Sequence, residues 1–276
     1  MSSKSERPGI ADQTLQRAAL ALQMQRPDEA ERLAAAVFKA NRGNVAAAAL
    51  LGRALMLQNR FDEAIAPLQK ASRRGEDPAT DTLLATAFAA TGRRDDALGL
   101  LRQAIARRPA FPPAFLEYAS QLASGGKIDE AIAVLEEGLS LAPGIVELQL
   151  RLATLHIGRN KRAEARAMLQ QAAAAAPSRP DVLAELARVM VLDGDYAAAV
   201  DVFRRALALR PDDAPTRANL GICLLELGER AAGEASVRDA ARHRPDMTGR
   251  AIMSLAAASH GRFFLRPSAA AKFLIS

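Results

Sequence analysis

The sequence has few of the residues on which disulfide bridging, metal binding and catalysis depend. It contains one cysteine, Cys223, so no disulfide can form within the chain, and a reducing compartment is expected. Its three histidines, His156, His243 and His260, have no second histidine or cysteine at the spacing of a metal site. We therefore expect no metal, no cofactor and no catalytic residue.

Other features of enzymes and exported proteins are missing as well. No apolar run is long enough to cross a membrane, and the first residues, MSSKSERPGI, carry no apolar signal-peptide core, so we expect a cytoplasmic protein. Neither Gly-x-Ser-x-Gly nor Gly-x-Gly-x-x-Gly occurs, and SGGKID at 124–129 lacks the other residues of a phosphate-binding loop. These absences predict that the protein is not an enzyme.

The residues that are abundant favour helices. Half of the chain is hydrophobic and a quarter is charged, which is typical of a folded, soluble protein. With aromatic residues at 4% and no tryptophan, the core must consist of Ala, Leu, Val and Ile, and Ala and Leu are strong helix formers. The net charge of +6 permits an anionic partner, but the scarcity of aromatic residues for base stacking argues against nucleic acid.

The chain is organised as an internal repeat of 34 residues. Five prolines mark this period, namely Pro109, Pro143, Pro177, Pro211 and Pro245. In the repeat that ends at Pro211, one apolar face consists of Leu183, Leu186, Ala187 and Met190, and a second consists of Ala199, Phe203 and Ala206. Gly194 lies between these faces and provides the left-handed conformation that ends a helix. Each repeat is therefore predicted to be two helices that stack on the next pair.

This pattern resembles the tetratricopeptide repeat (TPR) family, in particular bacterial TPR solenoid proteins, and the Ala- and Arg-rich usage suggests a bacterial source. The resemblance covers nearly the whole chain. It implies an all-α fold, an α-α superhelix: a right-handed solenoid of about seven helix pairs over residues 11–247, with a C-terminal capping helix. The expected repeats are about 11–44, 45–77, 78–111, 112–145, 146–179, 180–213 and 214–247. They are flanked by a disordered N-terminus (1–10) and a degenerate eighth repeat with cap and tail (248–276).

The same resemblance implies a non-enzymatic protein-interaction scaffold or adaptor that holds a peptide or helix of a partner in the concave groove lined by the first helices. The candidate groove residues are Leu50, Arg53, Leu57, Leu83, Thr86, Glu117, Glu147, Arg151, Asp181, Glu185, Arg188 and Asn219. Acidic residues predominate in the later repeats, which predicts either a peptide with a basic end or ordinary solvated groove residues with no single ligand. The alternative is a regulatory or substrate-presenting subunit of a separately encoded enzyme such as a transferase.

Two further surfaces, a row of basic turn residues and the C-terminal tail, can each be interpreted either as purely structural or as a binding site. The turn after the first helix is basic in five successive repeats, at Arg26, Arg60, Arg93, Lys127 and Lys161. This row is either an ordinary polar turn position or an edge that binds an anionic partner, such as nucleic acid or an acidic protein. The C-terminal tail carries Phe263, Phe264 and Phe273, which either cap the solenoid or dock a partner.

Overall fold

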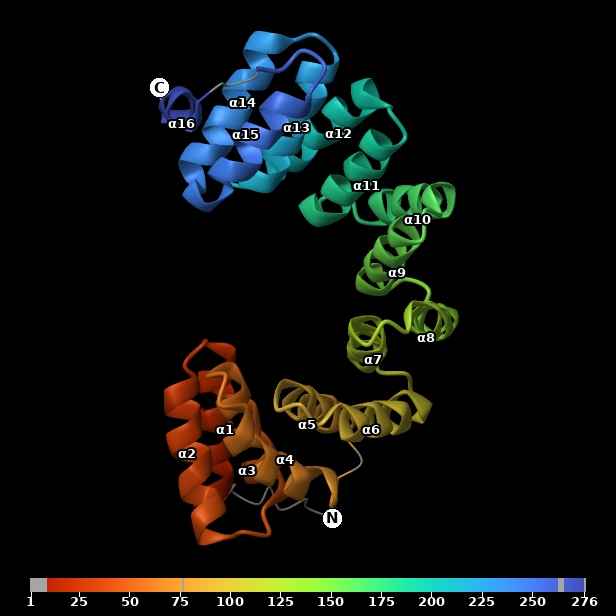
Figure 1. Cartoon of the computed structure of the whole chain (residues 1–276). Coiled ribbons are helices and arrows are strands. Elements are labelled where there is room, and N and C mark those ends of the chain that lie inside the picture. Colours follow the sequence, from red (N-terminus) through yellow and green to blue (C-terminus); the bar gives the residue numbers. More distant parts are fainter. Residues whose placement is uncertain (1–8, 76, 263–265, 276) are drawn as a thin grey trace, which may run out of the picture. The chain divides into compact units, whose positions relative to one another are not determined.

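The computed structural model describes residues 9–75, 77–262 and 266–275, and these form an all-helical chain that divides into two compact halves, Met1–Ile145 and Val146–Ser276 (Figure 1). The N-terminal half contains α1 (Ile10–Gln23), α2 (Pro27–Ala40), α3 (Val45–Leu57), α4 (Phe61–Ser72), α5 (Pro78–Ala90), α6 (Arg94–Ala106), α7 (Pro112–Ser124) and α8 (Ile128–Leu141). The C-terminal half contains α9 (Val146–Gly158), α10 (Arg162–Ala175), α11 (Pro180–Leu192), α12 (Tyr196–Leu209), α13 (Ala214–Glu226), α14 (Arg230–His243), the 3-10 turn η1 (Pro245–Met247), α15 (Thr248–Ala257) and α16 (Pro267–Ile275). Helix α1 begins at Ile10, one residue inside the segment expected to be disordered, while residues 1–8 lie outside the described residues.

Each odd-numbered helix from α1 to α13 is joined to its partner by the same three-residue turn. The residue before the second helix donates its N–H to the carbonyl five residues back, as Asp195 does to Met190 over 2.9 Å, which is the Schellman arrangement. The residue preceding that donor has a positive φ in all seven pairs. These residues are Gln25, Asn59, Gly92, Gly126, Asn160, Gly194 and Gly228. The expectation for Gly194 is therefore confirmed, and the conformation recurs throughout the chain.

Small residues occur where the two helices of a pair cross. Ala187 of α11 and Ala199 of α12 are fully buried, as the repeat pattern predicts. At the position equivalent to Ala187, α3 has Gly52, where an added Cβ would lie 2.4 Å from the Leu68 side chain. Such a contact is too close for any side chain, so this crossing requires glycine.

Branched or aromatic side chains fill the space between successive pairs at one position of each second helix from α4 to α14. These residues are Leu68, Leu101, Leu135, Leu169, Phe203 and Val237, and each is completely buried. Burying a side chain of this size contributes about 2 kcal/mol, so the repeated position supplies much of the stacking energy. The core is thus continuous along each half rather than confined to single pairs.

Within each half, the helix pairs are closer together on the side of the first helices. Consecutive first helices, such as α3 and α5 or α9 and α11, contact each other, whereas consecutive second helices between α2 and α8, or between α10 and α14, do not. A stack that is closed on one side and splayed on the other curves towards the closed side. The first helices therefore line the inner face of each half, and grooves open between the second helices on the outer face.

Candidate functional site

The predicted groove residues of the N-terminal half lie on α3, α5 and α7, on the inner face. Arg53 is exposed, and Leu57 is 49% exposed, although it is a large apolar side chain. Leu50 instead packs between buried residues of α1 and α3, so it contributes to the core as well as to the surface. The half-buried Glu117 accepts a 2.8 Å hydrogen bond from Gln121. Leu83 and Thr86 are half-buried on α5.

In the C-terminal half, the predicted groove acids are held by arginines. Arg179, which lies just before α11, donates to Glu147 over 2.6 Å and to both carboxylate oxygens of Asp181 over 2.6 and 2.9 Å. These hydrogen bonds lower the pKa of both carboxyls and raise the pKa of the Arg179 guanidinium. Glu185 pairs in the same way with Arg188, at 2.7 Å.

This pairing removes the excess negative charge on which the expectation of a basic peptide end depended. Arg179 was not among the predicted groove residues, because it lies outside the first helices. Arg179 neutralises Glu147, which lies 32 residues earlier in the chain, so local sequence spacing does not reveal this pair. Arg151 is exposed on α9 and Asn219 is half-buried on α13, so the predicted groove residues of this half are all polar, and with Arg179 their acidic and basic side chains are equal in number.

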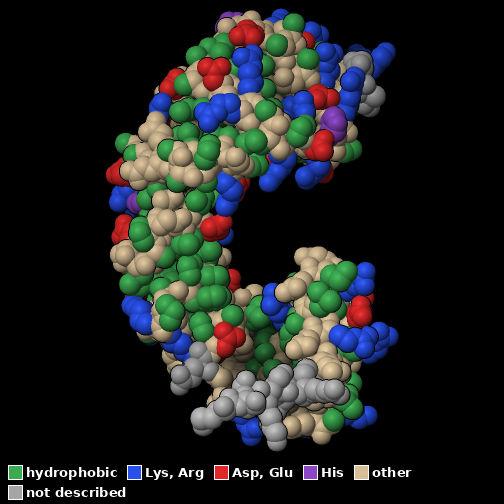
Figure 2. Space-filling view, turned by 180° about the vertical axis from the view of Figure 1, so that it is seen from behind, with side chains coloured by type: hydrophobic (Ala, Val, Ile, Leu, Met, Phe, Trp, Pro, Cys, Tyr) green, Lys and Arg blue, Asp and Glu red, His purple; other side chains and the backbone are tan. Residues whose placement is uncertain are grey.

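The basic residues of the predicted edge are the residues that precede the second helices. Four of them pair with the acid three residues later, in the first turn of the helix. These pairs are Arg26–Glu29 at 3.7 Å, Arg60–Glu63 at 2.6 Å, Arg93–Asp96 at 2.7 Å and Lys127–Glu130 at 3.1 Å. Acidic side chains in the first turn interact favourably with the positive end of the helix dipole, and the preceding basic side chain neutralises part of their charge. Figure 2 likewise shows Lys and Arg side chains interspersed with Asp and Glu side chains on the visible face.

The described part of the C-terminal tail packs on the end of the repeat array. Phe273 of α16 is half-buried against the apolar cluster of α13, α14 and α15, which includes Val237 and Leu255. The guanidinium groups of Arg238 and Arg262 lie 5.0 and 4.6 Å from the centre of its ring. Phe263 and Phe264 lie outside the described residues. The contacts of Phe273 favour the capping interpretation of α16.

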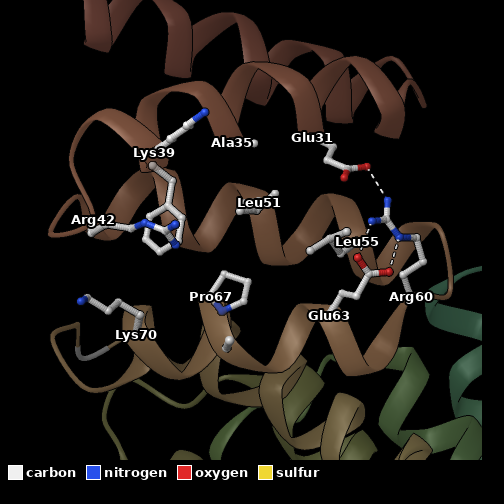
Figure 3. Close-up of a pocket in the computed structure, with 12 residues that line it drawn as sticks. Glu31, Ala35, Lys39, Arg42, Leu51, Leu55, Arg60, Glu63, Pro67 and Lys70 are labelled. Atoms are coloured by element: carbon white, nitrogen blue, oxygen red, sulfur yellow. Dashed lines mark hydrogen bonds and ion pairs between the residues drawn. The ribbon is translucent and has the colours of Figure 1, made fainter.

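A groove on the outer face, between α2 and α4, was not predicted from the sequence (Figure 3). It has a volume of about 620 Å³, and we call it the α2/α4 groove. Leu51 and Leu55 of α3 form its floor, with Phe38 of α2 and Pro67 of α4 beside them. Both walls of this groove belong to second helices, whereas the predicted surfaces were the first helices, the basic turns and the C-terminal tail.

The two ends of the α2/α4 groove differ in charge. At one end, Arg60 donates to Glu31 over 2.7 Å and to both carboxylate oxygens of Glu63 over 2.7 and 2.6 Å. These hydrogen bonds raise the pKa of Arg60 and lower that of Glu63, which favours the charged form of both groups. At the other end lie Lys39, Arg42 and Lys70, as Figure 3 shows.

The described residues include no arrangement with evident catalytic chemistry. Burial raises the pKa of the Cys223 thiol to about 12, so the thiol is protonated at neutral pH. His156 is buried, and its Nδ1 has no hydrogen-bond partner among the described residues. No group of three His, Cys, Asp or Glu side chains in this part of the chain lies close enough together to hold a metal ion.

None of the helices that the structure describes has both the length and the hydropathy needed to span a membrane.

Comparison with known proteins gives one family. A tetratricopeptide repeat model matches residues 21–87, 122–189 and 190–257, and a second tetratricopeptide repeat model matches residues 82–144. The sequence has no significant match among curated proteins.

Solved structures with a similar fold include three bacterial proteins. A thermophilic TPR protein of Thermus thermophilus is 22% identical over 66% of this chain and 99% of its own, with a TM-score of 0.55. The pilF protein of Pseudomonas aeruginosa is 20% identical over 73% of this chain and 92% of its own, with a TM-score of 0.62. A tetratricopeptide repeat protein of Parabacteroides merdae is 14% identical over 88% of this chain and 98% of its own, with a TM-score of 0.65.

Proposed function

Because the chain belongs to the tetratricopeptide repeat family, we propose that it is a non-enzymatic scaffold that binds a segment of a partner protein along the inner face. The observation that carries this proposal is the contact between consecutive first helices, which makes their exposed side chains one surface within each half. Leu57 and Arg151 are exposed on that surface and are free to contact a ligand. Recognition by such a face needs complementary shape and charge but no reactive group.

The balanced charge of the C-terminal half favours a partner segment with both acidic and basic residues. Arg179 and Arg188 lie beside Asp181 and Glu185, so both signs of charge are presented close together. A segment of one sign would meet repulsion from half of these groups, whereas a mixed segment can pair with each. A cytoplasmic adaptor, or a regulatory subunit of a separate enzyme, would use the same surface.

Binding through the predicted basic edge is less well supported. Four of its five cations already pair with an acid on the following helix, so an anionic ligand would have to displace those carboxylates. Exposed pairs of this kind contribute little to stability, but they reduce the net charge that would attract nucleic acid.

The proposal is tested by affinity capture from the source cell lysate, with quantitative mass spectrometry and two matched double variants. Leu57→Asp with Arg151→Glu changes the inner face, and Leu209→Asp with Arg205→Glu makes the same changes on α12, a second helix. Leu57 and Leu209 are 49% and 47% exposed, so both variants are expected to fold. A partner retained by the wild type and the α12 variant but lost from the inner-face variant supports the proposal. Partners that bind all three proteins equally would contradict it.

A further inference from the structure

The α2/α4 groove exists because the second helices separate over α3. Consecutive second helices of the N-terminal half do not contact each other, so the outer side of α3 is covered only partly. Ala35 and Ala66 form the walls at this point, and their short side chains leave the floor accessible. An equivalent groove of about 390 Å³ lies between α4 and α6, where Leu84 and Phe88 occupy the places of Leu51 and Leu55.

The comparison between these two grooves shows what is particular to the first. Lys70 near the end of α4 has its counterpart in Gln103 of α6, and Pro67 has its counterpart in Leu100. The last turns of α2 and α4 contain Lys39 and Lys70, whereas the last turn of α6 has no basic residue. The α4/α6 groove has Arg73 at the place of Lys39 but no second cation among its lining residues at this end, so of the two grooves only the α2/α4 groove carries a cluster of cations there.

The three cations at this end are available to a ligand. Lys39, Arg42 and Lys70 form no ion pair with any described residue, in contrast to Arg60 at the opposite end. Arg42 lies over the Phe38 ring at 5.2 Å, which orients its guanidinium beside the apolar floor. Phe38 and Leu55 are only 9% and 4% exposed, so the apolar surface open to a ligand comes mainly from the half-buried Leu51 and from Ala35 and Ala66 on the walls. The groove therefore offers an apolar strip that leads to a cluster of positive charge.

We propose that the α2/α4 groove binds an amphipathic peptide segment of a partner protein, with large apolar side chains on the floor and acidic residues at the end next to Lys39, Arg42 and Lys70. The α2 wall extends from Glu31 to Lys39, about 12 Å at the helical rise, which corresponds to about two turns of a bound helix. Because this surface belongs to the second helices, the site is separate from the inner face, and neither proposal depends on the other.

The shape of the groove favours a peptide over an acyl chain. The groove is open to solvent between α2 and α4, and Figure 3 shows its lining side chains between these two helices. An acyl chain has no polar side and would leave much of its own apolar surface in water. An amphipathic segment buries its apolar side chains and presents polar ones to solvent.

The proposal is tested by selecting peptides from a random phage-displayed library on the full-length chain. We expect the enriched sequences to combine several large apolar residues with at least two acidic residues, and we expect Lys39→Glu with Lys70→Glu to abolish this enrichment. Failure to enrich such peptides, or equal enrichment on the charge-reversed variant, would overturn the proposal. Circular dichroism melting of each variant shows whether a loss of binding reflects unfolding.

The selected peptide then separates groove binding from general electrostatic attraction. In fluorescence anisotropy, Ala66→Gln is expected to weaken the peptide at least about tenfold, because the longer side chain fills the groove without changing its charge. Gly99→Gln makes the equivalent change in the α4/α6 groove and should leave the affinity unchanged. If the Ala66 and Gly99 variants bind the peptide equally well, the groove is not a peptide site. The same conclusion follows if palmitate displaces the peptide and binds the wild type more tightly than the peptide does. The proposal would also be overturned if the wild type sediments as a dimer and Ala66→Gln sediments as a monomer, because a second copy would then occupy the groove.

Discussion

At the scale of the residue, the turn within each helix pair requires one backbone conformation, and the chain meets it with three residue types. Glycine adopts a positive φ without cost, and it occurs at four of the seven turns. Asn59 and Asn160 adopt φ values of 59° and 60° there, as asparagine does more readily than most residues. Gln25 has φ 58° in the first turn and has no such preference. The turns therefore differ in how well their residues suit them.

We expect Gly194→Ala to lower the free energy of unfolding by about 1 kcal/mol, because alanine is disfavoured in the left-handed region. The control is Gly99→Ala in α6, where an added Cβ would have no atom within 4 Å and the backbone is helical. That change is expected to raise the free energy of unfolding by about 0.5 kcal/mol. Urea denaturation measures both, and a stabilising effect of Gly194→Ala would contradict the argument.

At the scale of the element, a buried carboxylate connects three helices of the N-terminal half. Asp81 of α5 is completely buried, and its Oδ1 accepts a 2.6 Å hydrogen bond from the Ser72 hydroxyl at the end of α4. Its Oδ2 lies 2.8 Å from the guanidinium of Arg107, the residue that follows α6. A buried charge of this kind is tolerated only while its partners remain. The arrangement thus fixes where α4 and α6 end relative to α5.

Arg107→Ala is expected to destabilise the protein by about 3 kcal/mol, because it leaves the Asp81 carboxylate buried without a cation. Combining it with Asp81→Asn should recover part of the loss, since the remaining group is neutral. Chemical denaturation of the two single variants and the double variant measures the coupling between these residues. Additive effects in this cycle would show that the two side chains do not interact.

A second buried carboxylate, that of Glu234, stabilises the C-terminal cap formed by α15 and α16. Glu234 of α14 is buried and accepts hydrogen bonds from Arg230 and from Arg262, which lies between α15 and α16. Burial alone would raise the pKa of this carboxyl, but the two arginines outweigh it and hold the pKa below the ordinary value of 4.5. A carboxyl with a lowered folded pKa stabilises the fold above its unfolded pKa, and this contribution is lost as the pH falls through the folded value.

The attachment of α16 should therefore weaken in acid and not in mild base. We expect amide hydrogen exchange of α16, after correction for intrinsic rates, to accelerate below about pH 4 and to stay constant between about pH 6 and 8. Glu234→Gln should accelerate exchange of α16 at neutral pH and remove its dependence on acid. A wild-type profile that is flat down to about pH 3 would disprove the role of Glu234.

At the scale of the whole molecule, stacked repeats distribute stability between neighbours rather than across the chain. Within each half, a helix pair packs on the pairs next to it, so a local defect should spread only a short distance. Leu68 is completely buried in α4 against Gly52 of α3, and its removal affects the second and third pairs first.

We expect Leu68→Ala to destabilise α3, α4 and α5 by about 3 kcal/mol. Hydrogen exchange of these helices should accelerate at neutral pH, while exchange of α11 to α14 should remain as in the wild type. Acceleration of the whole chain by the same factor would show that it unfolds as a single cooperative unit.

The helices, their pairing and the repeated core could be predicted from the residues alone, because they follow from contacts within a few residues of the chain. The spacing of Leu183, Leu186 and Met190 defines one helical face, and the proline period gives the length of the repeat. The same reasoning placed Gly194 in its turn and Phe203 in the core, as the structure shows.

The pairing of charges between repeats and the grooves of the outer surface could not be predicted in this way. Arg179 reaches Glu147, and Arg60 reaches Glu31, across about one repeat, and these contacts depend on the rotation between neighbouring pairs. The α2/α4 groove has the same origin, since it is the gap left when α2 and α4 splay over α3. That rotation results from packing along each half, and no local spacing in the sequence encodes it.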